Sequence, residues 1–420
     1  MSDHNKVMAT NVFVHSVMEY YMWTEKFRLN DLREFDTIIR NIMNKEKAKY
    51  SLQMNASLYL PRNKGGRGLR NFESLYKKIK IKSVMNILCT TDPRVRCVKE
   101  FDCLRMNKGK GSMVNDAIRY AEEDFNISFK SSEDGFEVKM INGNEDNTVT
   151  KIPAVKQMLK NEEMKNLVKE VESSKWQGVI LKSRYNDSTI TNTAFTWLTK
   201  WKSCPVDTIN ELQSIHLQTI PTLTFQKCRG ETNIQAATCR MCKSGNESVK
   251  HLLSSCSYFL PSAIKRRHDK TLQWILFNFL FKHKLVEKCP PWYSNITIKP
   301  YYENKTTKLF WDIPEYSGSE DEEGDRVLRP DGKIVFNEKK KIYILEMSVP
   351  WTDNHDEKFK EKESKYVDIV QRLKINNPGY NVKQLTFIID GLGAYSNELV
   401  LSLKNLFNEK EIKPILYGMQ

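Results

Sequence analysis

The chain has 420 residues, of which 40% are hydrophobic and 28% charged, and its formal net charge is +14. This length is sufficient for two or three domains with hydrophobic cores, and the composition excludes a disordered or fibrous protein. The excess of positive charge favours an acidic polymer as partner, with nucleic acid as the first candidate, although a solubilising surface would carry the same charge.

The N-terminal stretch lacks the apolar core of a secretory signal, which favours a reducing compartment. The nine cysteines are therefore considered first as metal ligands rather than as disulfide partners. The densest apolar run, residues 274–281, is too short to span a bilayer. We expect no membrane-spanning segment and no membrane partner.

A predominantly helical region is predicted for residues 1–130. Residues 27–43 carry apolar side chains at helical spacing; they are Leu32, Phe35, Ile38, Ile39, Ile42 and Met43. Residues 58–84 read as a strand-like run, a glycine-rich basic turn and a basic amphipathic helix. The turn could contact phosphate, or its charges could be incidental on a solvated loop; its basic residues are Arg62, Lys64, Arg67 and Arg70.

Residues 131–150 are predicted to be a polar linker, and residues 151–302 a second helical region. Residues 303–327 contain a strongly acidic stretch and are predicted to be a loop. From residue 328 to 420 the pattern changes to strand, strand, helix, strand, helix, which indicates a compact α/β unit.

Within the second helical region, residues 239–256 have the spacing C-x2-C-x8-H-x4-C. Cys239, Cys242, His251 and Cys256 supply four soft ligands of the type and spacing of a structural zinc site, with no open coordination position. Six of the nine cysteines lie elsewhere in the chain. The alternative is therefore that these four residues are unrelated and form no metal site. A zinc knuckle could also present basic side chains to nucleic acid.

A helix is predicted for residues 261–281, after Pro261 near its start. Its first turns carry four basic residues, which form either a phosphate-binding face or an ordinary solvated helix face; they are Lys265, Arg266, Arg267 and Lys270.

The stretch 329–351 reads as a hairpin with an acid at the end of each strand. A four-residue turn at 337–340 would place Asp331 directly opposite Glu346. Two opposed carboxylates repel each other unless a cation neutralises them, and Mg²⁺ commonly uses one or two carboxylates with substrate phosphate. The alternative is a hairpin whose carboxylates lie at a solvated rim.

The next helix, residues 355–374, places a lysine on its apolar stripe. Lys362 lies between Phe359 and Tyr366 on that face, and a buried ammonium needs a partner, which the two acids could provide. Such a lysine could assist an attacking water or stabilise charge on phosphate. It could instead extend to solvent.

Four motifs in this region, "RPD", "ILEMSVPW", "EKESKY" and "FIIDGLG", resemble the restriction-like endonuclease of site-specific non-LTR retrotransposons, a distant variant of the PD-(D/E)xK nucleases. The resemblance implies that Asp331 and Glu346 bind Mg²⁺ or Mn²⁺ and that Lys362 is the catalytic lysine. Lys365 and Tyr366 match the neighbouring pair of that motif. The compact ExK motif of restriction enzymes is absent, because Ser348 occupies the position of its lysine.

Two further segments are similar to the same elements, in the same order. The Cys/His segment followed by "RRHDKTL" is similar to their zinc knuckle, and the segment from 32 to 69 to their reverse-transcriptase thumb. The implied architecture is multidomain, α plus α/β: a helical thumb and linker region with a zinc knuckle, then a PD-(D/E)xK-like endonuclease.

The implied function is that of a nuclear protein that nicks target DNA to prime reverse transcription of an element RNA. The chain contains no adjacent Asp-Asp pair, so we expect a truncated polyprotein without polymerase activity. The alternative is a catalytically inactive nucleic-acid-binding relic or domesticated protein that keeps the fold and the zinc. A zinc-stabilised scaffold without a nucleic-acid role is a third reading, disfavoured by the charge.

Overall fold

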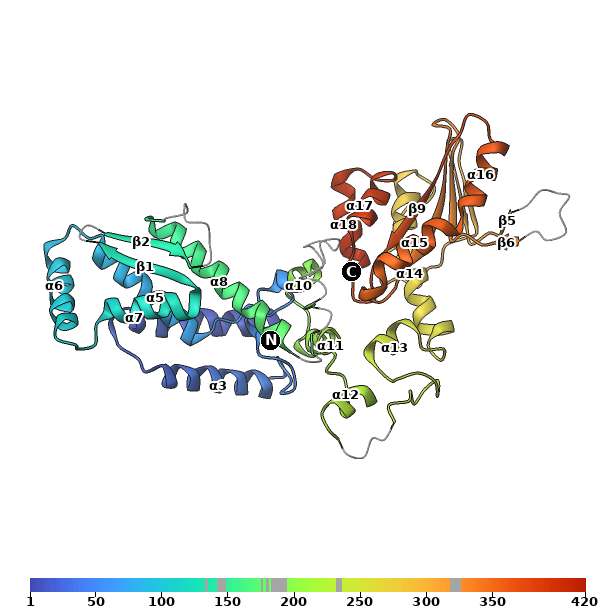
Figure 1. The fold of residues 1–420 in the computed structure, drawn as a ribbon. Coiled ribbons are helices and arrows are strands. Elements are labelled where there is room, and N and C mark those ends of the chain that lie inside the picture. The colour runs from blue at the N-terminus through green and yellow to red at the C-terminus, as the bar shows by residue number, and fades with distance from the viewer. Residues whose placement is uncertain are drawn as a thin grey trace. The chain divides into compact units, whose positions relative to one another are not determined.

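The structure is a computed structural model that describes residues 1–132, 135–141, 149–174, 177–178, 181–182, 195–231, 236–317 and 326–420. The chain combines helices and strands and divides into two compact units (Figure 1). The N-terminal unit spans residues 1–178 and 201–217, and the C-terminal unit spans 179–200 and 218–420. None of the described helices is long and apolar enough to cross a membrane.

The described residues of the N-terminal unit are mainly helical and include a β-hairpin. Its elements are α1 (Asp3–Ala9), the π-helical turn η1 (Thr10–His15), α2 (Ser16–Thr24), α3 (Leu29–Lys45), α4 (Ala56–Tyr59), the 3-10 turn η2 (Arg62–Lys64), α5 (Phe72–Leu88), α6 (Pro93–Asn107), α7 (Met113–Phe125), β1 (Ile127–Ser132), β2 (Gly135–Met140), α8 (Ile152–Ser173) and α11 (Val206–His216). Helix α5 is buried along most of its length and packs against α7 and the hairpin.

Helix α3 matches the predicted span, but its buried face differs from the predicted one. Leu32 and Met43 are buried, whereas Phe35, Ile38 and Ile42 are 39%, 46% and 46% exposed. The inward face carries a carboxylate: Asp36 accepts hydrogen bonds from the backbone N–H of Phe72 and the side-chain amide of Asn71, each at 2.9 Å. The strand-like run predicted at residue 58 is wrong, because residues 56–59 form the helical turn α4.

The predicted polar linker at 131–150 is also wrong in part. Residues 135–140 form β2, which pairs antiparallel with β1 from Ile127 opposite Met140 to Ser132 opposite Gly135. Phe136 and Val138 alternate with polar residues, and both pack into the core of the unit. The polar outer face of this strand gave the segment the composition of a linker. Residues 133–134 and 142–148 of the predicted linker lie outside the described residues.

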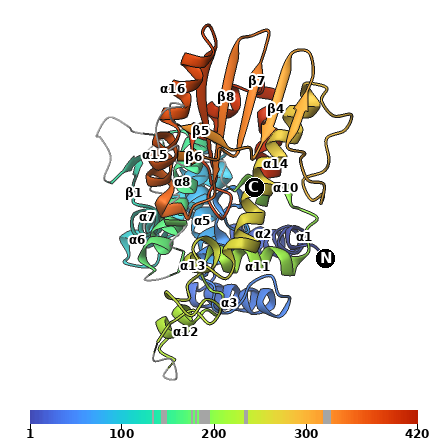
Figure 2. The same ribbon diagram turned by 90° about the vertical axis from the view of Figure 1, so that its right-hand side faces the viewer.

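The C-terminal unit contains a five-stranded sheet in the order β3-β4-β7-β8-β9 (Figure 2). Strands β3 (Tyr301–Glu303), β4 (Thr307–Trp311), β7 (Gly332–Phe336) and β8 (Lys341–Ser348) are antiparallel, and β9 (Asn381–Ile388) runs parallel to β8. The remaining elements are α10 (Thr196–Lys200), α12 (Leu223–Cys228), α13 (Val249–Ser254), the π-helical turn η3 (Leu260–Ile264), α14 (Lys265–Lys282), β5 (Glu315–Ser317), β6 (Arg326–Leu328), the 3-10 turn η4 (Thr352–Asn354), α15 (His355–Lys365), α16 (Val367–Asn376), α17 (Asn397–Lys404) and α18 (Glu409–Met419).

Helices cover both faces of this sheet. Side chains of α14, α17 and α18 form the main core with one face, which includes Ile334 and Leu345. On the other face Ile344 packs against Tyr366 and Ile369. Because both faces of β8 are covered, its side chains from Ile342 to Met347 are all buried.

Two predictions for this unit need correction. The acidic loop predicted at 303–327 contains strand β4, whose pairing with β7 adds it to the sheet; residues 318–325 lie outside the described residues. Thr307 and Leu309 of β4 are buried, and Phe310 and Trp311 of the same strand are partly buried, so the apolar run that precedes the acidic residues belongs to the sheet. The single helix predicted at 355–374 is two helices, because Tyr366 interrupts it with φ −116° and ψ 18°.

Candidate metal centre and carboxylate site

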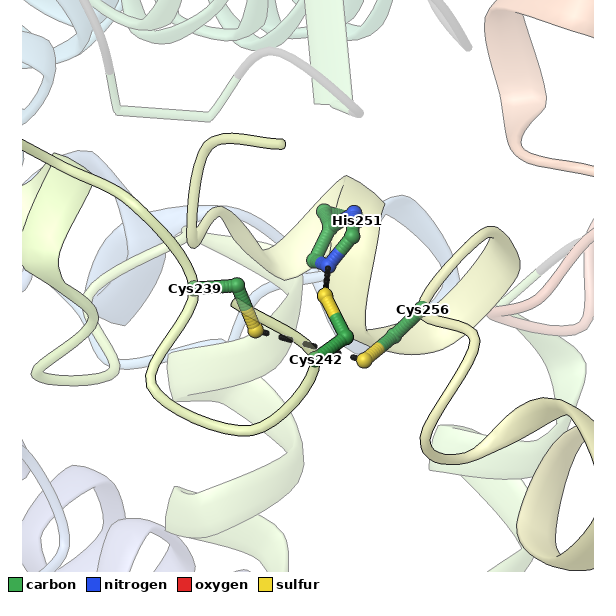
Figure 3. A group of neighbouring side chains, drawn as sticks. All are labelled: Cys239, Cys242, His251 and Cys256. Atoms are coloured by element: carbon green, nitrogen blue, oxygen red, sulfur yellow. Dashed lines mark hydrogen bonds between the residues drawn. The ribbon is translucent and has the colours of Figure 1, made fainter. Parts of the chain in front are cut away.

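The predicted Cys/His ligands come together in the C-terminal unit (Figure 3). Cys239 and Cys242 lie in a turn closed by the bridge between Thr238 and Asn246. His251 lies on the short helix α13, which begins after Ser248; the Ser248 hydroxyl accepts a hydrogen bond from the His251 N–H at 3.1 Å. Cys256 follows the same helix.

The ligand atoms of these four residues all lie within 4.8 Å of one another. The Sγ atoms of Cys239 and Cys256 are 4.0 Å apart, and Cys242 Sγ is 3.2 Å from His251 Nε2. A tetrahedral zinc ion with Zn–S bonds of about 2.3 Å places its sulfur ligands about 3.8 Å apart. The group is called the Cys₃His cluster below, and it could hold a metal ion such as zinc.

Neighbouring residues prepare this cluster for a cation. Hydrogen bonding to Ser244 lowers the pKa of the Cys242 thiol to about 6, which favours the thiolate that binds metal. Gly245 has φ +67°, and a Cβ there would lie 3.3 Å from the His251 ring. Buried Glu247, which sequence reasoning missed, accepts hydrogen bonds from the backbone N–H of Arg240 at 2.9 Å and of Leu223 at 3.2 Å. It therefore joins the cluster to α12.

The β7–β8 hairpin has the predicted register. Its pairs run from Phe336 opposite Lys341 to Gly332 opposite Leu345, and the next position in this register sets Asp331 opposite Glu346. The predicted four-residue turn and the register of the paired residues are confirmed, and Asp331 lies one residue before the first pair. The pair is called the carboxylate site below.

Glu346 is buried, with 1% of its surface exposed, and its two oxygens differ. Oε1 accepts hydrogen bonds from the ammonium groups of Lys362 and, at 3.3 Å, Lys365. Oε2 is buried and has no hydrogen-bond donor among the described residues. Burial and the Asp331 charge raise the pKa of Glu346, and Lys362 opposes both effects. The structure therefore brings Glu346, Lys362 and Lys365 together.

Asp331 is held by a backbone amide and by a histidine outside the predicted set. Its Oδ2 accepts a hydrogen bond from the Met347 N–H at 2.7 Å and lies 3.4 Å from Nε2 of His268. The same Nε2 is 3.1 Å from the Met347 carbonyl oxygen, and Nδ1 is 3.0 Å from Asp269.

Asp331 and His268 each stabilise the charged form of the other. Burial alone would lower the pKa of His268, but the hydrogen bond to Asp331 and its charge raise it to about 9. Burial would raise the pKa of Asp331, but His268 holds it below its ordinary value. The segment "RRHDK" indicates only a basic helix face, and no local pattern indicates the distant partner of its histidine.

Tyr366 anchors the end of α15 beside this site. Its hydroxyl donates to the Arg329 carbonyl at 2.9 Å, and its ring packs against Ile344. Burial and the Glu346 charge raise its pKa, so the hydroxyl stays protonated. The Lys365 ammonium lies 4.6 Å from the centre of the ring.

The basic turn predicted to contact phosphate is largely occupied with internal pairing. Arg67 is buried and pairs with fully buried Asp3, and Arg62 reaches the same carboxylate at 2.5 Å. Arg70 pairs with Glu19 at 3.1 Å, and Lys64 is partly exposed. Arg67 is therefore not available to a ligand; it holds α1 against the turn.

The four basic residues in the first turns of α14 differ in exposure and in their contacts. Lys265 and Arg266 are exposed. Arg267 donates to the Leu253 carbonyl at 2.7 Å, and Lys270 donates to the Ser294 carbonyl at 2.5 Å. Two of the four therefore brace α14, and two face solvent.

No protein-family model matches the chain, and no curated protein matches it in sequence. The geometry of the Cys₃His cluster and of the carboxylate site is therefore the basis for assigning a function.

Proposed function

We propose that the C-terminal unit is a metal-dependent endonuclease that hydrolyses a DNA phosphodiester bond at the carboxylate site. One observation carries this proposal: Glu346 has a buried carboxylate oxygen without a donor, opposite a second carboxylate and beside two lysines. A structural role alone does not require two opposed acids at the end of a covered sheet, since such a pair destabilises it.

The residues fit a hard divalent cation such as Mg²⁺ or Mn²⁺. A buried anionic oxygen without a partner is costly, and a cation would satisfy it. Asp331 and Glu346 would hold the ion, since Mg²⁺ typically takes one or two protein carboxylates and completes its shell with water and phosphate. When bound, such an ion polarises a phosphoryl group and activates water.

The lysines supply the remaining charge. Lys362 fixes the Oε1 side of Glu346 and, at 19% exposure, presents its ammonium at the edge of the site. There it can orient an attacking water or stabilise charge that develops on the phosphate. Lys365 contacts the same oxygen at 3.3 Å and is more exposed, so it suits a contact with the phosphate backbone.

We further propose that the Cys₃His cluster holds structural zinc and that the chain belongs to a retrotransposon polyprotein acting in the nucleus on target DNA and an element RNA. The support is the ligand set, its geometry and the order of the motifs in the sequence. Without an adjacent Asp-Asp pair, this chain is not expected to polymerise DNA.

A supercoiled-plasmid assay tests the nuclease. We expect the zinc-loaded protein to produce open-circular DNA with Mg²⁺ or Mn²⁺ and none with EDTA. Asp331→Asn should lower the rate by at least about a hundredfold, since it removes an anionic oxygen from the metal site. Glu338→Gln is the matched control, because it makes the same acid-to-amide change in the exposed turn of the same hairpin. Equal nicking by Asp331→Asn and wild type would refute the assignment.

The second candidate is a nucleic-acid-binding protein that no longer cuts. The net charge of +14 and the exposed Lys265 and Arg266 favour it. It predicts salt-dependent DNA binding by the wild-type protein and no nicking with either metal.

A further inference from the structure

His268 belongs to neither predicted ligand set, yet it contacts the carboxylate site directly. It lies in the first turns of α14, and only 26% of its side chain is exposed. Its Nε2 lies near two oxygens at once: Oδ2 of Asp331 at 3.4 Å and the Met347 carbonyl at 3.1 Å. An N–H placed between two acceptors orients both of them.

These contacts constrain one oxygen of Asp331 and leave the other unpartnered. Oδ2 accepts from the Met347 N–H at 2.7 Å and faces His268 Nε2. Oδ1 has no hydrogen-bond donor among the described residues, and neither has Oε2 of the opposed Glu346. Each acid therefore has one oxygen engaged by the protein and one left for a ligand.

The histidine is itself held in place. Asp269 contacts Nδ1 at 3.0 Å, so both ring nitrogens have partners. The neighbouring Arg267 donates to the carbonyl of Leu253 on α13 at 2.7 Å, which ties this turn of α14 to the helix that carries His251 of the Cys₃His cluster. The cluster thus helps to fix the position of His268.

We infer that His268 is a positioning residue of the carboxylate site: its Nε2–H fixes the Asp331 carboxylate and the Met347 peptide so that Asp331 Oδ1 is presented to a divalent cation. This inference rests on the proposed function, because it assigns the cation to the same pair of acids. Groups that orient metal ligands in this way commonly change metal affinity by ten- to a hundredfold when they are removed.

Two substitutions separate orientation from packing. His268→Gln keeps an N–H donor at the position of Nε2, whereas His268→Leu keeps the bulk and removes the donor. His283→Leu is the matched control, because it removes an imidazole from the other end of the same helix, where His283 packs on Phe336 away from both acids.

Mn²⁺ binding to the zinc-loaded protein, followed by electron paramagnetic resonance, gives a readout independent of cutting. The signal lost in Glu346→Gln defines the site. We expect His268→Leu to weaken this binding at least tenfold, and His268→Gln and His283→Leu to stay within threefold of wild type. Nicking should follow the same order.

The outcomes are distinct. The inference is overturned if a folded His268→Leu protein binds Mn²⁺ with wild-type affinity. It is also overturned if Glu346→Gln binds Mn²⁺ as tightly as the wild-type protein does. Weakened Mn²⁺ binding in His268→Leu without nicking by the wild type sustains the inference and defeats the nuclease. Normal nicking by His268→Leu sustains the nuclease and defeats the inference.

Discussion

The pairing of His268 with Asp331 makes the stability of the C-terminal unit depend on pH in a defined direction. The folded pKa of about 9 exceeds the ordinary value of 6.5 that applies to the unfolded chain. Below pH 6.5 both states hold the proton, so the stabilisation is fully present. Between pH 6.5 and 9 the unfolded chain has released the proton while the folded state still holds it. The free energy of unfolding therefore decreases with each pH unit in this range, and the stabilisation is lost as the pH passes the folded pKa.

The size of the effect follows from the difference between the two pKa values. Each pH unit corresponds to about 1.4 kcal/mol, so the full range from 6.5 to 9 corresponds to about 3–4 kcal/mol. His268 is about three-quarters buried, so solvent screening reduces this figure only partly. A loss of this order is a large part of the stability of an ordinary domain.

Urea unfolding of the zinc-loaded protein at pH 6, 7.5 and 9, without divalent cations, measures the effect. His268→Gln should lose the pH dependence that His268 contributes. The difference between the two proteins removes contributions from other groups that titrate in this range, such as Lys49, whose burial lowers its pKa to about 8. The histidine resonance absent from His268→Gln reports the pKa directly by NMR, and a value at or below 6.5 would refute the reasoning.

Four further substitutions have expected outcomes. Cys256→Ser should lower bound zinc from one ion per chain to less than half, measured by mass spectrometry of metals, and should destabilise the C-terminal unit by several kcal/mol; full zinc content would contradict the ligand set. Asp3→Ala should destabilise the N-terminal unit by about 3–5 kcal/mol in urea, because it removes the carboxylate that pairs with the buried guanidinium group of Arg67 and with Arg62, whereas a change under 1 kcal/mol would show that the pairing is dispensable. Gly66→Ala should destabilise the same unit by about 2–3 kcal/mol, because its Cβ would overlap the Leu60 carbonyl oxygen. Gly68→Ala, with φ +77° and open space, should cost only about 1 kcal/mol, and the reverse order of the two would contradict this account.

The sequence predicted those features that depend on local spacing. Cys239, Cys242, His251 and Cys256 are close in the chain, so their convergence needs only one turn and one short helix. The hairpin register followed from the turn length and the flanking apolar runs.

Features that depend on distant partners were missed. His268 meets the Met347 carbonyl across 79 residues, and nothing near it in the sequence marks that contact. Asp36 occupies the buried face of α3, where the apolar pattern indicated Phe35, because its partners Asn71 and Phe72 come from another helix. The positive charge of Arg67 suggested a contact with phosphate. Its partner is instead Asp3, which lies at the start of the chain.

The hairpin determines where the spacing between the two acids can vary. Asp331 and Glu346 oppose each other because the strands between them and the turn pair residue for residue. An extra residue within β7 or β8 would move one acid to the other face of the sheet, but an extra residue in the turn at 337–340 would lengthen a loop and leave the acids opposed. Proteins that share this site can therefore differ in the number of residues between the acids, and a search pattern with one fixed interval would overlook them.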